Sequence, residues 1–122
     1  MNVHFIAVGG SAMHSLALAL ATREGVRVTG SDDVALSTSF GRESAYIAVH
    51  MYKGMEYERY FRSVEAILTP MQGRPHWGKI HFQSAKTLQP CYDRFGDFLA
   101  LRERLDPERR FVNEYVGRVL GL

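Results

Sequence analysis

A single amphipathic stretch between residues 57 and 68 constrains this chain more than any other feature. Its apolar side chains recur at helical spacing, at Tyr57, Tyr60, Phe61, Val64, Ile67 and Leu68. Residues three and four positions apart share one side of an α-helix. Glutamates at positions 56 and 58 suit the helix N-terminus, and Pro70 ends the helix. We therefore predict a helix over 57–68 whose continuous aromatic face lies in a core.

The segment after this helix cannot be regular structure. Residues 72–79 read Gln-Gly-Arg-Pro-His-Trp-Gly-Lys, with two glycines and one proline among eight residues. Such a density of breakers predicts a defined turn. His76 and Lys79 flank Trp77 in this turn, so both polar heads could be aimed at one point.

The first 33 residues have the pattern of a β-turn-α-β unit. Val3–Val8 is an apolar run that ends at Gly9-Gly10, and Ser11 can cap a helix that reaches Arg23. A second strand is expected at 26–29, and a turn closes the unit at 30–33. This is the size of one nucleotide-binding half-motif, in which a glycine turn and a helix N-terminus face a phosphate. A tight turn without ligand fits the pattern equally well.

The rest of the chain, residues 34–122, predicts a mixed segment of strands and helices. We expect a loop at 34–44, a strand at 45–50 and a brief strand at 80–82. Helical patterns follow at 85–88, 95–105 and 111–120, and Asp106-Pro107 separates the last two. The predicted fold class is α+β, with a first unit at 1–33 and a second at 34–122. An exposed edge on strand 45–50 would favour self-association.

Composition excludes several functional classes. The 122 residues are 46% hydrophobic, carry a net charge of +2 and include one cysteine. The near balance of charge and the lack of a Lys/Arg run argue against a nucleic-acid partner. No stretch has the length of a transmembrane segment or the form of a signal peptide, so we expect a cytoplasmic location. The histidines show no metal-ligand spacing, and we expect no metal site.

Residues 2–33 resemble the opening of a Mur ligase of the UDP-N-acetylmuramate type. The resemblance rests on the runs His4–His14 and Val28–Asp33. It implies that Gly9, Gly10, Ser11 and Met13 contact the UDP part of a nucleotide. The sequence contains no Gly-Lys-Thr or Gly-Lys-Ser phosphate loop, so ligase activity is not expected.

Residues 32–122 resemble the C-terminal end of a D-arabinono-1,4-lactone oxidase, in the group that includes gulonolactone and alditol oxidases. The strongest motif is Gly73–Lys79, supported by Ala45–His50, Tyr60–Glu65, Asp106-Pro107 and Phe111–Asn113. The resemblance implies an FAD-dependent oxidoreductase that removes a hydride from a sugar lactone or an alditol. In that family a separate N-terminal domain holds most of the FAD. We therefore expect little activity from these residues alone, and possible activity beside a separate FAD-binding chain.

The same resemblance names candidate site residues. Lys79, His76 and His50 are the candidate catalytic residues, while Trp77, Arg74 and Asn113 are the candidate substrate or cofactor contacts. Arg27 is ambiguous. It stands five residues before Asp32, as the arginine of a family Glu-x-Arg motif would, but Gly25 occupies the glutamate position. We favour an accidental match for Arg27.

Simpler interpretations stand beside these. His50 could be structural, Lys79 a surface charge, and Trp77 a core residue with a bonded N–H. Two further functions also remain open: a non-catalytic module that binds a UDP-sugar at Gly9-Gly10, and a chimeric reading frame without selected function.

Overall fold

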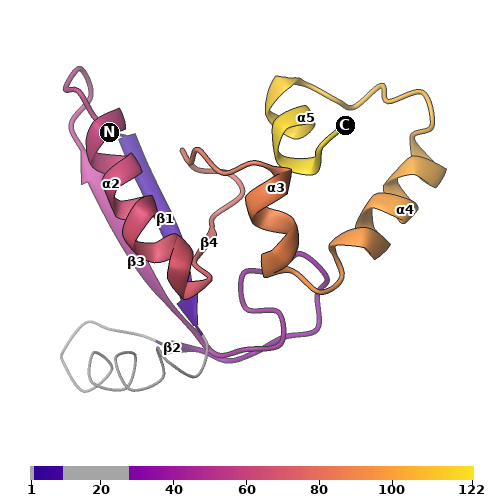
Figure 1. Ribbon diagram of the computed structural model, residues 1–122, viewed down its shortest axis with the longest axis horizontal. Helices are drawn as coiled ribbons and strands as arrows, with labels where there is room; N and C mark the ends of the chain where they lie inside the picture. The colour runs from indigo at the N-terminus through magenta and orange to yellow at the C-terminus, as the bar shows by residue number, and fades with distance from the viewer. Residues whose placement is uncertain (1, 10–27) are drawn as a thin grey trace.

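The computed structural model describes residues 2–9 and 28–122 as an α+β arrangement (Figure 1). Four strands form one sheet in the order β2-β3-β1-β4. Every neighbouring pair is antiparallel, and Asn2 to Gly9 of β1 pair in register with Met51 to Ser44 of β3. The strands are β1 (Asn2–Gly9), β2 (Val28–Thr29), β3 (Ser44–Met51) and β4 (Arg74–Pro75).

The sheet draws on both predicted segments. β1 confirms the expected first strand, and its neighbours β3 and β4 come from the part of the chain after residue 33. β2 covers the end of the strand expected at 26–29, and β3 lies between β2 and β1. The expected helix from Ser11 to Arg23 lies outside the described residues. The division of the chain at residue 33 stays a prediction.

β3 confirms the strand predicted at 45–50 and extends it by one residue at each end. β2 pairs only with Ser44 and Ala45 of β3. Among the described residues, 46–51 therefore have a strand partner on one side only. The predicted open edge is limited to this part of β3, and self-association through it stays a prediction.

Helix α2 (Glu58–Leu68) confirms the strongest sequence pattern, and a 3₁₀ turn, η1 (Thr69–Met71), follows it at Pro70. Figure 1 shows α2 along one face of β1 and β3, where Leu68 packs against Ile47 and Val64. The predicted continuous aromatic face is wrong in part, because Tyr60 and Ile67 are 46% and 62% exposed. They lie at the borders of the buried stripe, while the carboxylate-bearing Glu65 lies inside it.

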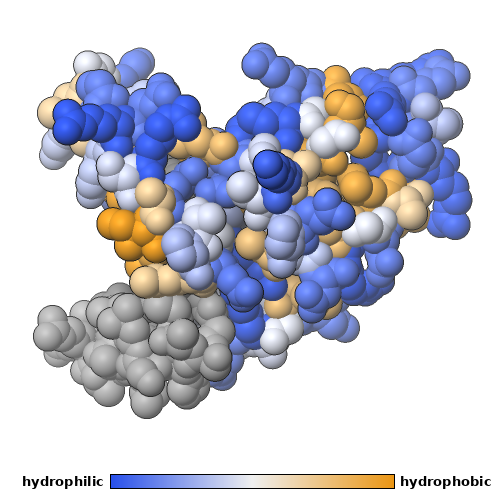
Figure 2. Space-filling view, in the orientation of Figure 1, coloured by the Kyte–Doolittle hydropathy of each residue, from blue (hydrophilic) through white to orange (hydrophobic). Residues whose placement is uncertain are grey.

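A second core joins the C-terminal helices. Its buried members are Leu88, Tyr92, Phe95, Val119 and Leu120. These residues come from α3 (Ala85–Leu88), α4 (Phe95–Leu105), α5 (Glu114–Leu120) and the segment between α3 and α4, which includes η2 (Gln89–Cys91). The predicted helices at 85–88 and 95–105 are confirmed. Figure 2 shows apolar surface over this part of the molecule, where Leu101, Leu105 and Phe111 are exposed.

Three sequence predictions were wrong. In each case the cause is a contact with a distant part of the chain or a side chain that caps backbone N–H groups. Arg74–Pro75 is a short strand because it pairs with Ala7 and Ile6 of β1. Residues 80–82 form no strand, since their hydrogen bonds go to side chains of α2 and α5. The last helix begins at Glu114 and not near 111. Asp106 binds the backbone N–H groups of Arg110 and Phe111, which holds this stretch outside the helix.

Within the described residues, no helix combines the length and the apolar character needed to cross a membrane.

Candidate functional site

The turn that follows β4 is closed by two hydrogen bonds to His76. The Lys79 backbone N–H donates to the His76 carbonyl at 3.1 Å, and the Gly78 N–H donates to His76 Nδ1 at 3.0 Å. A Cβ on Gly78 would lie 3.4 Å from His76 Cε1, so the ring packs at van der Waals distance from this position. Because Nδ1 accepts, the neutral imidazole carries its proton on Nε2.

Trp77 anchors this turn to the rest of the fold. Its indole Nε1 donates to the Leu36 carbonyl at 2.8 Å, and its ring lies 5.4 Å from that of Tyr92. Its carbonyl accepts a hydrogen bond from the Tyr115 hydroxyl at 2.5 Å. These contacts direct the indole inward, as expected for a core residue with a bonded N–H. The predicted contact of Trp77 with substrate or cofactor stays untested.

Arg74 ties three chain segments together. Its side chain is buried, and its Nε donates to the Cys91 carbonyl at 2.8 Å. Its Nη1 donates to the carbonyls of Phe40 and Thr38 at 2.8 and 3.3 Å. The guanidinium also stacks 4.7 Å from the Tyr92 ring, and burial lowers the pKa of Arg74. Every observed contact is structural, so the predicted role of Arg74 at a substrate finds no support in them.

His76 and Lys79 are both exposed, as the predicted site requires. Among the described residues, the Lys79 ammonium has no ion pair or hydrogen bond. The anchored turn therefore presents these two side chains from a fixed base. Asn113 has a different task, because its side chain accepts the Val116 N–H at 2.8 Å and caps α5. Its predicted contact with the flavin stays untested.

His50 lies on the sheet face opposite α2. Residues alternate sides along a strand, and Ile47 of β3 packs against α2. Tyr46 points to the other side, where its hydroxyl bonds Thr38 and Ser39 in the loop after β2. Ala48 and His50 share this side and are exposed, and we call the surface they form the open face. Strand spacing puts the Cα of Pro75 roughly 14 Å from that of His50, across β1.

Glu65 of α2 binds the residues that follow the closed turn. Its carboxylate accepts the Phe82 N–H at 2.9 Å and the Gln83 amide at 3.2 Å. Arg62 of the same helix stacks 3.9 Å from the Phe82 ring. The sequence did contain a signal for this contact, because Glu65 is a charged residue on the apolar side of an amphipathic helix. The sequence interpretation missed Glu65 as well as Leu36, His81 and Tyr115.

Glu65 also predicts a pH effect. Burial raises the pKa of its carboxyl, although the bonds from Phe82 and Gln83 offset part of this. A raised pKa means that the folded state binds the proton more tightly than the unfolded state. The contribution of Glu65 to the free energy of unfolding should therefore become more favourable as pH falls from about 7 to about 4.5.

Chemical denaturation at both pH values tests this expectation. The wild type should gain stability relative to Glu65→Gln in acid, whereas the exposed control Glu58→Gln should show no such trend. A constant difference between wild type and Glu65→Gln at both pH values would contradict the assignment.

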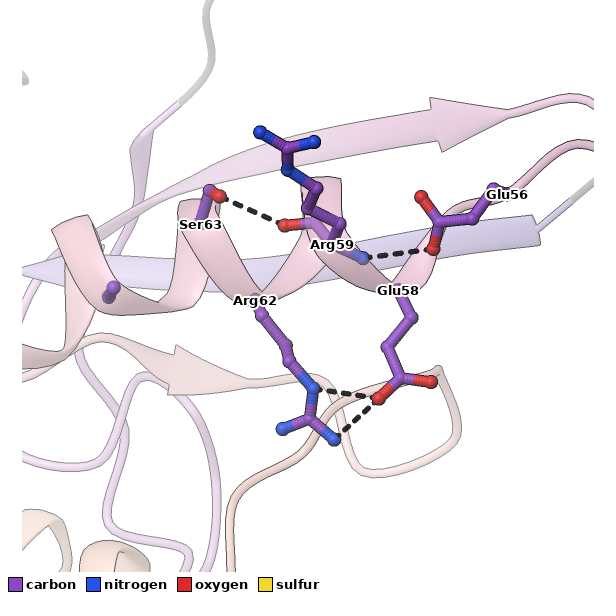
Figure 3. A pocket seen from close by; sticks show the side chains of 6 residues that line it. Glu56, Glu58, Arg59, Arg62 and Ser63 are labelled. Atoms are coloured by element: carbon purple, nitrogen blue, oxygen red, sulfur yellow. Dashed lines mark hydrogen bonds and ion pairs between the residues drawn. The ribbon is translucent and has the colours of Figure 1, made fainter.

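A hollow of about 580 Å³ runs along α2 and does not include the predicted site (Figure 3). Figure 3 shows Glu58 and Arg62 pointing toward one another, and they form an ion pair at 2.8 Å. The hollow is lined by Glu56, Glu58, Arg59, Arg62, Ser63 and Ala66. Within the described residues, no group of three or more His, Cys, Asp or Glu side chains could hold a metal ion.

Comparison with known proteins decides the family. The family model described as D-arabinono-1,4-lactone oxidase matches residues 24–119. The chain belongs to this family. The match begins eight residues before the predicted start at 32, so it includes Arg27, whose structure lies outside the described residues. Whether Arg27 matches the family motif by accident stays a prediction. The match also contains the closed turn, the open face and Asn113.

Several curated oxidoreductases are similar to this chain. L-gulono-1,4-lactone dehydrogenase of Mycobacterium tuberculosis is 55% identical over 96 residues, which are 79% of this chain and 22% of that protein. Bovine L-gulonolactone oxidase is 40% identical over 98 residues, covering 77% of this chain and 22% of that protein. Alditol oxidase of a Streptomyces species is 35% identical over 98 residues, covering 78% and 23%. The chain thus spans about a fifth of the length of these relatives.

The predicted nucleotide-binding residues stay untested. Gly9 is the last residue of β1, while Gly10, Ser11 and Met13 lie outside the described residues and, like Gly9, outside the family match. The residues predicted to meet a substrate or a flavin differ in their exposure. Lys79 and His76 are exposed, whereas the buried cation Arg74 is already bonded to carbonyls.

Proposed function

We propose that this chain supplies the substrate side of an FAD-dependent oxidoreductase acting on a sugar lactone or an alditol. Family membership supports the reaction class, and the names of the relatives support the substrate class. The segment matched here is about a fifth of each relative. Most of the FAD would bind to another part of the enzyme. That part could be a separate chain.

Three side chains carry the proposed chemistry. The bound flavin would accept a hydride from the carbon that bears the reacting hydroxyl. Lys79 would stabilise negative charge that develops on the substrate oxygen, since its backbone belongs to an anchored turn and its ammonium extends from that turn. His76 would donate from Nε2, because its Nδ1 already accepts the Gly78 N–H. His50, on the open face, is the candidate for taking up the hydroxyl proton.

The closed turn is the observation that carries this proposal. Its exposed ends are an imidazole and an ammonium group, while its middle residue is bonded to two other segments. A loose surface loop would not hold the backbones of His76 and Lys79 in a fixed relation. Catalysis by preorganised charge needs such a base.

A graft tests the proposal directly. The matching 96 residues of the Mycobacterium tuberculosis dehydrogenase would be replaced by the homologous stretch of this chain. We expect the graft to retain a flavin absorption spectrum and to reduce an artificial electron acceptor when the lactone is added. The relative with those residues deleted is the control and should do neither. A folded graft that holds flavin but shows no lactone-dependent reduction would contradict the proposal.

A further inference from the structure

Helix α5 reaches the closed turn through the Tyr115 hydroxyl, which takes part in two hydrogen bonds. The Tyr115 hydroxyl lies 2.5 Å from the Trp77 carbonyl oxygen and 2.9 Å from Nε2 of the buried His81. The His81 and Tyr115 rings meet edge to face with centroids 5.6 Å apart. One phenol therefore connects the C-terminal helix, the buried imidazole and the middle residue of the turn.

The direction of the protons in these two hydrogen bonds follows from the donors available. A carbonyl oxygen can only accept, and a tyrosine hydroxyl has a single proton. The Tyr115 proton must therefore point to Trp77, and His81 Nε2 must carry the proton that it donates to the Tyr115 oxygen. Burial raises the pKa of Tyr115, which keeps the hydroxyl protonated. Two bonds that run in the same direction strengthen each other.

The same helix also holds the chain on the other side of the turn. Arg118, one helical turn after Tyr115, donates to the carbonyls of Gln83 and His81, the latter at 3.2 Å. Its guanidinium stacks 5.3 Å from the Tyr115 ring. Trp77 and residues 81–83 are thus both bound to one face of α5, and Gly78 to Ile80 lie between these attachments.

From these contacts we infer that Tyr115 and His81 are positioning residues for the turn that presents His76 and Lys79. Tyr115 acts through the Trp77 carbonyl, and His81 orients the Tyr115 hydroxyl. The consequence for catalysis rests on the proposed function. The consequence for the geometry of the turn does not, and it can be measured without flavin or substrate.

Trp77 is the only tryptophan of the chain, so fluorescence excited selectively at tryptophan, and not at the six tyrosines, reports on the turn. Tyr115→Phe keeps the ring against His81 and removes the hydroxyl. We expect stronger acrylamide quenching of the Trp77 fluorescence. Exchange of the Lys79 amide proton should become about fivefold to tenfold faster, as expected for the loss of one hydrogen bond. Far-ultraviolet circular dichroism would show that the helices remain.

Two comparisons separate positioning from a general loss of stability. Tyr60→Phe removes an exposed tyrosine hydroxyl that has no hydrogen bond among the described residues, and it should change none of these signals. His81→Gln keeps a side-chain N–H donor and should preserve the Trp77 spectrum, whereas His81→Leu should reproduce the Tyr115→Phe spectrum.

The inference is overturned by a folded Tyr115→Phe protein whose Trp77 quenching and Lys79 exchange equal those of the wild type. If Tyr115→Phe does not fold, the His81 pair decides. Equal Trp77 spectra for the Gln and Leu variants would then refute the inference. A folded graft that holds flavin but lacks activity would contradict the proposed function, whereas the inference about Tyr115 and His81 is decided by the spectra and the Lys79 exchange alone.

Discussion

In the grafted dehydrogenase, Lys79→Met is expected to lower kcat by about 10²-fold to 10³-fold, the usual loss when one preorganised group that stabilises developing charge is removed. The substituted side chain keeps most of the length and apolar stem of lysine, so the turn should stay intact. Steady-state reduction of an artificial acceptor with the lactone as substrate measures the effect. The flavin spectrum checks that the cofactor stays bound.

A matched lysine makes this result interpretable. Lys86 is exposed on α3 and belongs to the same grafted segment, so Lys86→Met should leave kcat unchanged. Lys79→Arg keeps the positive charge but replaces a compact ammonium with a planar fork, and it should give an intermediate rate. If Lys79→Met is as active as Lys86→Met, the ammonium plays no part in the reaction and the proposed role of the turn fails.

The second large effect is expected in the stability of the chain itself. Arg74→Leu should lower the free energy of unfolding by about 3 kcal/mol, because half-buried carbonyls lose a charged donor. The carbonyls of Phe40 and Cys91, each bonded at 2.8 Å, would be left without this partner. Urea denaturation followed by far-ultraviolet circular dichroism measures the change.

Arg104→Leu is the control for Arg74→Leu. Arg104 is exposed on α4 and has no ion pair among the described residues, so its replacement should change stability by less than about 0.5 kcal/mol. Arg74→Lys should lie between the two, since one ammonium cannot reach all the carbonyls that the guanidinium bonds. Equal stability of the Arg74 and Arg104 variants would show that the observed carbonyl contacts contribute nothing.

Local patterns were enough to predict most helices and the long strand. The α2 pattern needed only the spacing of its apolar residues and Pro70, and β3 needed only an alternating apolar run. The start of α5 could not be predicted in this way. Its position depends on the Asp106 carboxylate, which binds two backbone N–H groups before the helix begins. Such capping competes with helical propensity and is hard to read from periodicity.

The candidate site, too, could be predicted from the sequence only in part. Sequence identified the turn and its exposed polar ends, because glycine, proline and the family motif all lie within eight residues. It assigned Arg74 and Trp77 to ligand contacts, whereas the structure directs both side chains inward. The partners of these two residues are the carbonyls of Phe40 and Leu36, which are 34 and 41 positions away along the chain.

By itself, then, the sequence determined the family, the location of the turn and the types of group that the turn exposes. Only the tertiary structure decided that Arg74, Trp77, Glu65 and Tyr115 hold the turn, and that His50 lies on the sheet face opposite α2. The physical reason is the range of the interactions. Turn and helix preferences act between neighbours in sequence, whereas buried hydrogen bonds join groups that meet only after the sheet and the C-terminal helices have packed.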